Sequence, residues 1–91
     1  MSNKNITSAE FFLNQFNDYA NELSFNGETL HAVTDKSLIM KKSDGKLINF
    51  SKSDLEQDIT FQMEMGIFDE EEINKDNAQR KFVQVRSLLP A

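Results

Sequence analysis

The stretch KSLIMKKSDGKLINFSK, residues 36–52, decides the fold class that the sequence predicts. Short apolar runs lie on both sides of Ser43-Asp44-Gly45, which is typical of two strands joined by a tight turn. A three-residue loop with Gly45 in the left-handed position of a bulge places four apolar side chains on one face. We therefore predict an antiparallel hairpin over 37–51. Its apolar pairs are Leu38 with Phe50 and Met40 with Ile48.

A long helix is predicted ahead of the hairpin, over about residues 8–25. Thr7 and Glu10 have the spacing of a capping box, which satisfies backbone N–H groups at a helix start. Gly27 is placed to end this helix in a left-handed conformation. The apolar residues that recur at helical spacing are Phe12, Phe16, Tyr19, Ala20 and Leu23. The segment ETLHAVTD, residues 28–35, is rich in β-branched residues and predicts one further strand.

The segment SKSDLEQDITFQMEMG, residues 51–66, carries two competing patterns. Its second half alternates apolar and polar residues strictly, which indicates a strand. Ser53 and Glu56, however, have capping-box spacing, and apolar residues also recur at every fourth position, which indicates a helix. We predict a helix over 54–65 and keep a strand over 58–65 as the alternative.

The stretch MEMGIFDEEEI, residues 63–73, predicts that one helix ends and another begins. Gly66 is placed to end the first helix. Asp69 can be the N-cap of the next, with Glu72 as its capping-box partner. We predict a last helix from Asp69 onward, and the β-branched segment 82–88 keeps a late strand as the alternative.

Together these segments predict an α+β fold. A long N-terminal helix packs on a small antiparallel sheet of two or three strands, and two C-terminal helices follow. The 91 residues fit one domain, with residues 1–6 as a polar tail. No stretch approaches the roughly 18 apolar residues of a membrane span, and cysteine is absent, so we expect a cytoplasmic protein that does not enter membranes.

The composition argues against most catalytic and metal chemistry. The chain has no cysteine and one histidine, His31, whereas zinc needs several nitrogen or sulfur ligands and a general base needs an adjacent partner. Four consecutive acids on a helix splay around its axis and do not converge on calcium. No phosphate-binding glycine motif and no hydrolase motif occurs. We expect no enzyme activity, no metal and no cofactor.

The charge is distributed unevenly along the chain. Residues 35–52 carry five Lys against two Asp, whereas residues 54–72 carry eight acids and no base. With a net charge of −5 overall, this layout favours binding to a complementary protein over general binding to nucleic acid.

We therefore predict a small acidic protein that binds another protein and regulates or inhibits it, as phage anti-defence, immunity and antitoxin proteins do. A nucleic-acid-processing enzyme is a suitable partner, because carboxylates on helical faces can occupy a site built for phosphates. The residues expected to bind the partner are Glu56, Asp58, Glu64, Asp69, Glu70 and Glu71.

Two alternatives belong to other classes of function. The hairpin lysines Lys41, Lys42 and Lys46 could hold nucleic acid in an accessory protein, although direct binding to nucleic acid is less favoured than binding to protein. A self-associating structural subunit could instead use spare apolar surface at Phe11 and Phe12. The sequence does not determine the oligomeric state.

Overall fold

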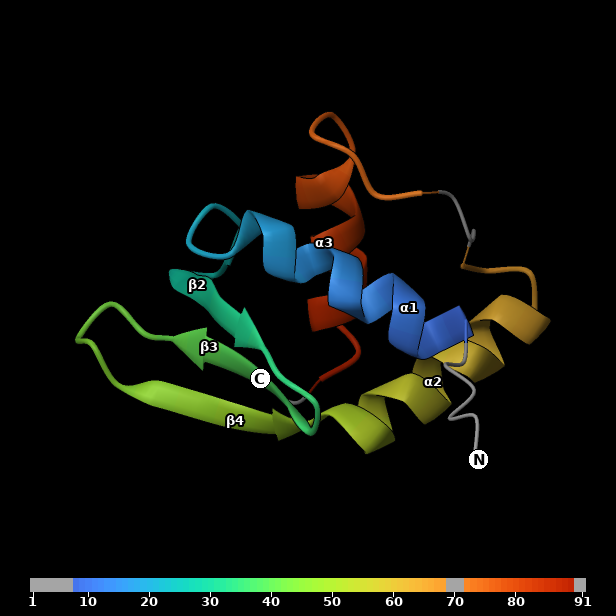
Figure 1. The fold of residues 1–91 in the computed structure, drawn as a ribbon, viewed down its shortest axis with the longest axis horizontal. Coiled ribbons are helices and arrows are strands. Elements are labelled where there is room, and N and C mark those ends of the chain that lie inside the picture. Colours follow the sequence, from blue (N-terminus) through green and yellow to red (C-terminus); the bar gives the residue numbers. More distant parts are fainter. Residues whose placement is uncertain (1–7, 69–71, 90–91) are drawn as a thin grey trace, which may run out of the picture.

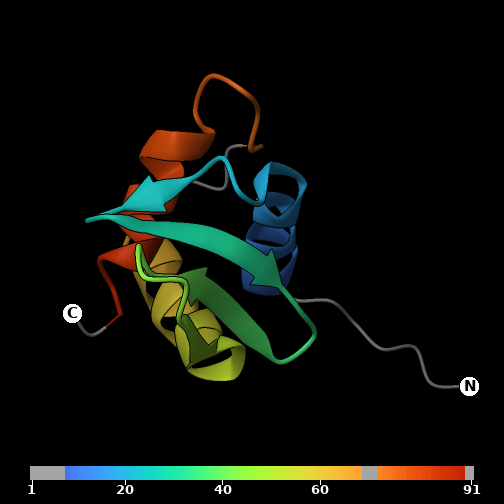
Figure 2. The same cartoon turned by 90° about the vertical axis from the view of Figure 1, so that its left-hand side faces the viewer.

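The computed structural model describes residues 8–68 and 72–89 and confirms the α+β class (Figure 1). The four strands of the described part form one antiparallel sheet in the order β1-β2-β3-β4. The helices lie on one side of this sheet (Figure 2). The elements are α1 (Ser8–Gln15), the 3-10 helix η1 (Phe16–Tyr19), β1 (Ser24–Phe25), β2 (Glu28–Val33), β3 (Ser37–Lys41), β4 (Leu47–Ser51), α2 (Lys52–Glu64) and α3 (Ala78–Arg86).

The short strand β1 corrects the predicted sheet of two or three strands. Phe25 pairs with Glu28, and Asn26 and Gly27 form the turn between them with φ angles of 50° and 81°. Two successive residues with positive φ make a type I′ turn, for which Asn-Gly is a preferred sequence. Gly27 therefore closes a hairpin, and the prediction that it ends the long helix is wrong.

The predicted long N-terminal helix is also wrong in its second half. α1 ends at Gln15, and after η1 the chain leaves helical geometry at Ala20, whose ψ is 141°, followed by Asn21 with a φ of 71°. Asn21 N–H donates to the Leu30 carbonyl at 2.7 Å. The Asn17 side-chain oxygen accepts from Val33 N–H at 3.0 Å. These bonds to β2 stop a helix that the apolar spacing alone would continue.

The predicted hairpin is confirmed together with its register. Leu38 pairs with Phe50 and Met40 pairs with Ile48. Gly45 has a φ of 92°, as the three-residue loop requires. Leu38 and Met40 are fully buried, so the apolar face of the hairpin is the face that meets the helices.

The strand β2 contains a bulge. Its pairing with β3 shifts register between Leu30 and Ala32, which makes His31 the additional residue. The bulge lets both Leu30 and Val33 point into the core, while His31 is exposed.

The ambiguous segment after the hairpin is helical, so the strand alternative is excluded. α2 begins earlier than predicted, because Ser51 and not Ser53 is the N-cap. The Ser51 hydroxyl oxygen accepts from Asp54 N–H at 3.3 Å. The buried residues of α2, Lys52, Leu55 and Ile59, share one face and pack inward.

The end of α2 at Gly66 is confirmed, and it has the geometry of a Schellman motif. Gly66 has a φ of 76°, and its N–H donates to the Met63 carbonyl at 3.1 Å. Ile67 N–H donates to the Gln62 carbonyl at 2.9 Å. This turn leaves Ile67 exposed and directs Phe68 into the core.

The last helix begins at Ala78, so the prediction that it starts at Asp69 is wrong. Asp69 lies outside the described residues, but residues 72–74 are not helical. Asn77 N–H donates to the Asn74 side-chain oxygen at 3.0 Å, and Asn74 N–H donates to the Asn77 side-chain oxygen at 2.8 Å. This reciprocal pair closes the turn that leads into the helix, and the N-cap residue Asn77 makes no side-chain bond to the first turn of the helix itself. The helix then covers most of 82–88, which excludes the late strand.

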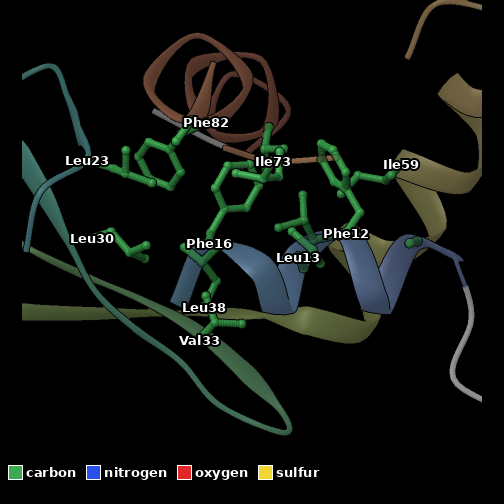
Figure 3. Packing of buried hydrophobic residues seen from close by; sticks show 14 of the residues in the cluster. Phe12, Leu13, Phe16, Leu23, Leu30, Val33, Leu38, Ile59, Ile73 and Phe82 are labelled. Atoms are coloured by element: carbon green, nitrogen blue, oxygen red, sulfur yellow. The ribbon is translucent and has the colours of Figure 1, made fainter. Parts of the chain in front are cut away.

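Aromatic side chains from distant segments meet in the core (Figure 3). Phe16 of η1 lies edge-to-face with Phe12 of α1 and with Phe82 of α3, at centroid distances of 5.4 and 5.6 Å. Phe12 also meets Phe68 edge-to-face at 5.5 Å. Such pairs contribute about 0.5–1.5 kcal/mol each beyond the area they bury. They fix both α3 and the segment after α2 against the first helix.

Arg86 at the end of α3 is the largest fully buried side chain. Its guanidinium carbon lies 4.8 Å from the ring centroid of Phe50 and 5.1 Å from that of Phe25. Its Nη2 atom lies 3.0 Å from a carboxylate oxygen of Glu28. These partners belong to β4, β1 and β2, so one side chain ties α3 to three of the strands.

We predict that Arg86→Met lowers the free energy of unfolding by about 3 kcal/mol, because it leaves the Glu28 carboxylate without its buried cation. Urea denaturation followed by circular dichroism measures this change. The control is Arg80→Met, an exposed position on the same helix, for which we expect a change within about 0.5 kcal/mol. Equal effects of the two substitutions would contradict the structural role of Arg86.

The Asn74–Asn77 pair gives a second prediction. Asn77 is buried, and its side-chain N–H donates to the Glu72 carbonyl at 3.0 Å. Asn77→Ala should therefore reduce stability by about 2 kcal/mol, since it removes the bonds that hold the turn before α3 and leaves part-buried backbone groups of Glu72 and Asn74 unpaired. The exposed neighbour Asp76→Ala should have little effect in the same denaturation experiment.

Candidate protein-binding surface

One face of α2 forms an exposed stripe of mixed character. Its residues recur at intervals of three or four, so they lie on neighbouring turns. They line an open hollow of about 410 Å³. We call this face the α2 stripe; its residues are Ser53, Glu56, Gln57, Thr60, Phe61 and Glu64.

The C-terminal end of the α2 stripe is apolar. Phe61 is 57% exposed, and Met65, one turn later, is 60% exposed. Ile67, just beyond the Schellman turn, is 65% exposed. Large apolar side chains that gather in one exposed place are typical of a contact surface for another molecule.

A smaller hollow lies beside this apolar end. It has a volume of about 170 Å³ and is lined by residues from the end of α2, the following turn and the end of α3. Phe68 is the buried apolar wall, and Leu88 is half-buried. We call it the α2–α3 hollow; its lining residues are Gln62, Ile67, Phe68, Gln84, Ser87 and Leu88.

The apolar end and the α2–α3 hollow are continuous around the helix. At about 100° per residue, Met65 lies about 40° from Phe61, and Gln62 lies a further 60° or so in the same direction. Met65 therefore stands between Phe61 on the stripe and Gln62 at the wall of the hollow. The two features form one surface that a single partner could cover.

Lys52 is the one basic residue within α2, and it is withdrawn from this surface. It is 2% exposed. Its ammonium group donates to the side-chain oxygen of Asn14 and, at 3.0 Å, to the Thr34 carbonyl. Glu10 lies 3.9 Å from the same nitrogen. The exposed ionisable side chains that α2 presents to a partner are therefore all acidic.

The structure divides the predicted acidic set. Glu56 and Glu64 both lie on the α2 stripe. Asp58 is exposed but projects from a different side of the helix, about 160° from Glu56. Asp69, Glu70 and Glu71 lie outside the described residues. Of the six acids that the sequence predicts for partner binding, the structure thus places Glu56 and Glu64 together on the α2 stripe.

The apolar part of the surface was not predicted from the sequence. The signal for it was present, because the strict alternation over residues 59–65 places apolar side chains where a helix has no core to receive them. Ile59 is buried, whereas Phe61 and Met65 lie on the outward side of the same helix. An apolar residue that does not fit the buried face of its element is the residue to examine for a contact role.

The alternative sites are placed elsewhere. Lys41, Lys42 and Lys46 are all exposed at the tip of the β3–β4 hairpin, at the far end of the molecule from the C-terminal end of α2 (Figure 1). Phe12 is buried in the core, so of the pair proposed for self-association only Phe11 is exposed, at 61%.

No group of three or more His, Asp or Glu side chains within residues 8–68 and 72–89 is arranged to hold a metal ion. None of the helices in the same ranges has the length and apolar character needed to cross a bilayer.

The chain was compared with known proteins, and the functional conclusion below rests on the geometry of the surface. Neither the protein-family models, nor the curated proteins, nor the solved structures contain a match to this chain.

Proposed function

We propose that this protein acts by binding another protein through the α2 stripe and the apolar residues at its end. The observation that carries the proposal is the exposure of Phe61, Met65 and Ile67 together, next to Glu64. Aromatic residues and methionine are enriched at the centre of protein interfaces, while charged residues are found at the rim. The composition and layout of this surface correspond to that pattern.

The consequence of binding is regulation or inhibition of the partner. More specifically, we propose that the partner is a nucleic-acid-processing enzyme, of the kind that phage anti-defence, immunity or antitoxin proteins block. Its support is electrostatic: residues 53–74 contain no basic residue, and an acid-only helical surface is complementary to a site that binds phosphates.

The proposal is tested by comparing substitutions in the apolar end of the α2 stripe with a substitution of an exposed apolar residue on the sheet. We expect the double variant Phe61→Ser/Ile67→Ser to retain about tenfold less of a captured partner than the unmodified protein, because the few central residues that dominate an interface cost more than about 1 kcal/mol each when truncated. Capture from cell lysate on immobilised protein, quantified by mass spectrometry at two salt concentrations, measures this. The control is Leu47→Ser on β4, since Leu47 is also exposed, at 53%.

A partner that is retained by the double variant and lost by Leu47→Ser would move the interface to the sheet. Failure of the unmodified protein to retain any partner, even at low salt, would refute the proposal.

The exposed hairpin lysines allow a direct test of the nucleic-acid alternative. We expect no retarded band in mobility-shift experiments with duplex DNA or with RNA, because a chain of net charge −5 is repelled by the phosphate backbone. A band that disappears in the Lys41→Glu/Lys42→Glu/Lys46→Glu variant, and weakens steeply with salt, would instead establish the hairpin as a nucleic-acid site.

A further inference from the structure

We propose that the partner element recognised by this surface is a basic peptide segment that inserts one apolar side chain into the α2–α3 hollow. The inference rests on the proposed function and names the chemistry of the partner. Three observations carry it: the size and lining of the hollow, the apolar residues at its margin, and the sign of the charges along the α2 stripe.

The hollow has the dimensions and lining of a pocket for one side chain. Its volume is about 170 Å³, and apolar cavities of about 150 Å³ accommodate a benzene ring. Phe68 and Leu88 supply apolar walls, and Ile67 lies at the exposed margin. An inserted aliphatic or aromatic side chain would therefore replace water with apolar contact on several sides.

The polar residues of the hollow are neutral. Gln62, Gln84 and Ser87 complete the lining, and each can both donate and accept a hydrogen bond. They can pair with the peptide backbone that flanks an inserted side chain, whatever its sequence. The hollow thus supplies the apolar anchor point, and charge selectivity must come from the adjoining stripe.

The stripe supplies negative charge at defined spacing. Glu56 and Glu64 are separated by eight residues, or about 12 Å along the helix axis. A neighbouring hollow shares Ser53 and Glu56 with the stripe and adds Glu10, Asp35 and Lys36. In the stripe and this neighbouring hollow together, acidic side chains outnumber basic ones. Lys or Arg side chains spaced along a peptide would therefore meet complementary charge.

The burial of Lys52 strengthens this preference for a basic peptide. Because its ammonium group is bonded beneath the surface to Asn14 and Thr34, it offers no positive charge to an acidic peptide. An acidic segment would bring further carboxylates close to Glu56 and Glu64, and like charges at an interface disfavour such a partner. The surface therefore discriminates between basic and acidic segments that carry the same apolar anchor.

The experiment uses the full chain and three synthetic helical peptides of equal length. The first combines Leu and Lys at amphipathic spacing, the second replaces every Lys with Glu, and the third replaces every Leu with Ala. Amide chemical shifts of isotope-labelled protein report both the affinity and the position of binding. We expect the Leu/Lys peptide to bind, with the largest shifts at residues 61–68 and 84–88, and the other two to bind at least about tenfold more weakly.

Matched variants separate charge from apolar contact. Glu64→Lys should weaken the Leu/Lys peptide about fivefold or more, because it reverses a charge beside the apolar end. Glu22→Lys is the control: Glu22 is exposed and belongs to the loop between η1 and β1, far from the C-terminal end of α2 (Figure 1). Ile67→Ser should weaken binding to a similar extent through the margin of the hollow.

The outcomes distinguish this inference from the function on which it rests. Equal binding of the Lys and Glu peptides at residues 61–68, with loss in Ile67→Ser, would overturn the basic partner and leave the protein-binding surface in place. Shifts located elsewhere, unaffected by either variant, would overturn both. Concentration-dependent shifts at the same residues without any peptide, together with a dimeric mass by light scattering, would identify a second copy of this chain as the occupant and overturn the basic peptide.

Discussion

The burial of the Arg86 guanidinium between the rings of Phe25 and Phe50 organises the rest of the fold. A buried cation is stable only where its charge is compensated, and here Glu28 provides a carboxylate at 3.0 Å. The stacked rings come from the first and last strands of the sheet, while Arg86 comes from α3. The position of α3 relative to the sheet is therefore fixed by one side chain whose displacement would leave a charge unpaired.

Burial of cations also shapes the surface. Lys52, Lys81 and Arg86 are each 2% exposed, whereas every Asp and Glu in the described ranges is at least partly accessible. On α2 the single basic residue, Lys52, is buried, whereas all of the acidic residues are at least partly accessible. The same arrangement that stabilises the start of α2 thus gives its outer face one sign of charge, on which the proposed preference for a basic partner depends.

Part of the fold and part of the candidate site could be predicted because the relevant signals are local. Gly45 and the facing apolar residues on either side of it define the hairpin register, and Gly66 defines the end of α2. The start of α3 could not be predicted in the same way, since it depends on a turn held by the buried Asn77, whereas the sequence pattern indicated a helix start at Asp69. The acids Glu56 and Glu64 were identified, but the exposed Phe61 beside them was not, because periodicity alone does not show which apolar side chains the core can receive.

The sequence by itself determined the α+β class, the central hairpin and the uneven charge, because each depends on residues that are neighbours along the chain. Only the tertiary structure decided where the first helix stops, which cations are buried and which apolar residues stay exposed. The Asn17 side chain holds the last helical turn against β2 by accepting a hydrogen bond from Val33, and Lys52 is buried because oxygens of Asn14 and Thr34 accept its hydrogen bonds. These outcomes depend on partners at least sixteen residues away, and the free energy of a buried polar group depends on whether such partners are present.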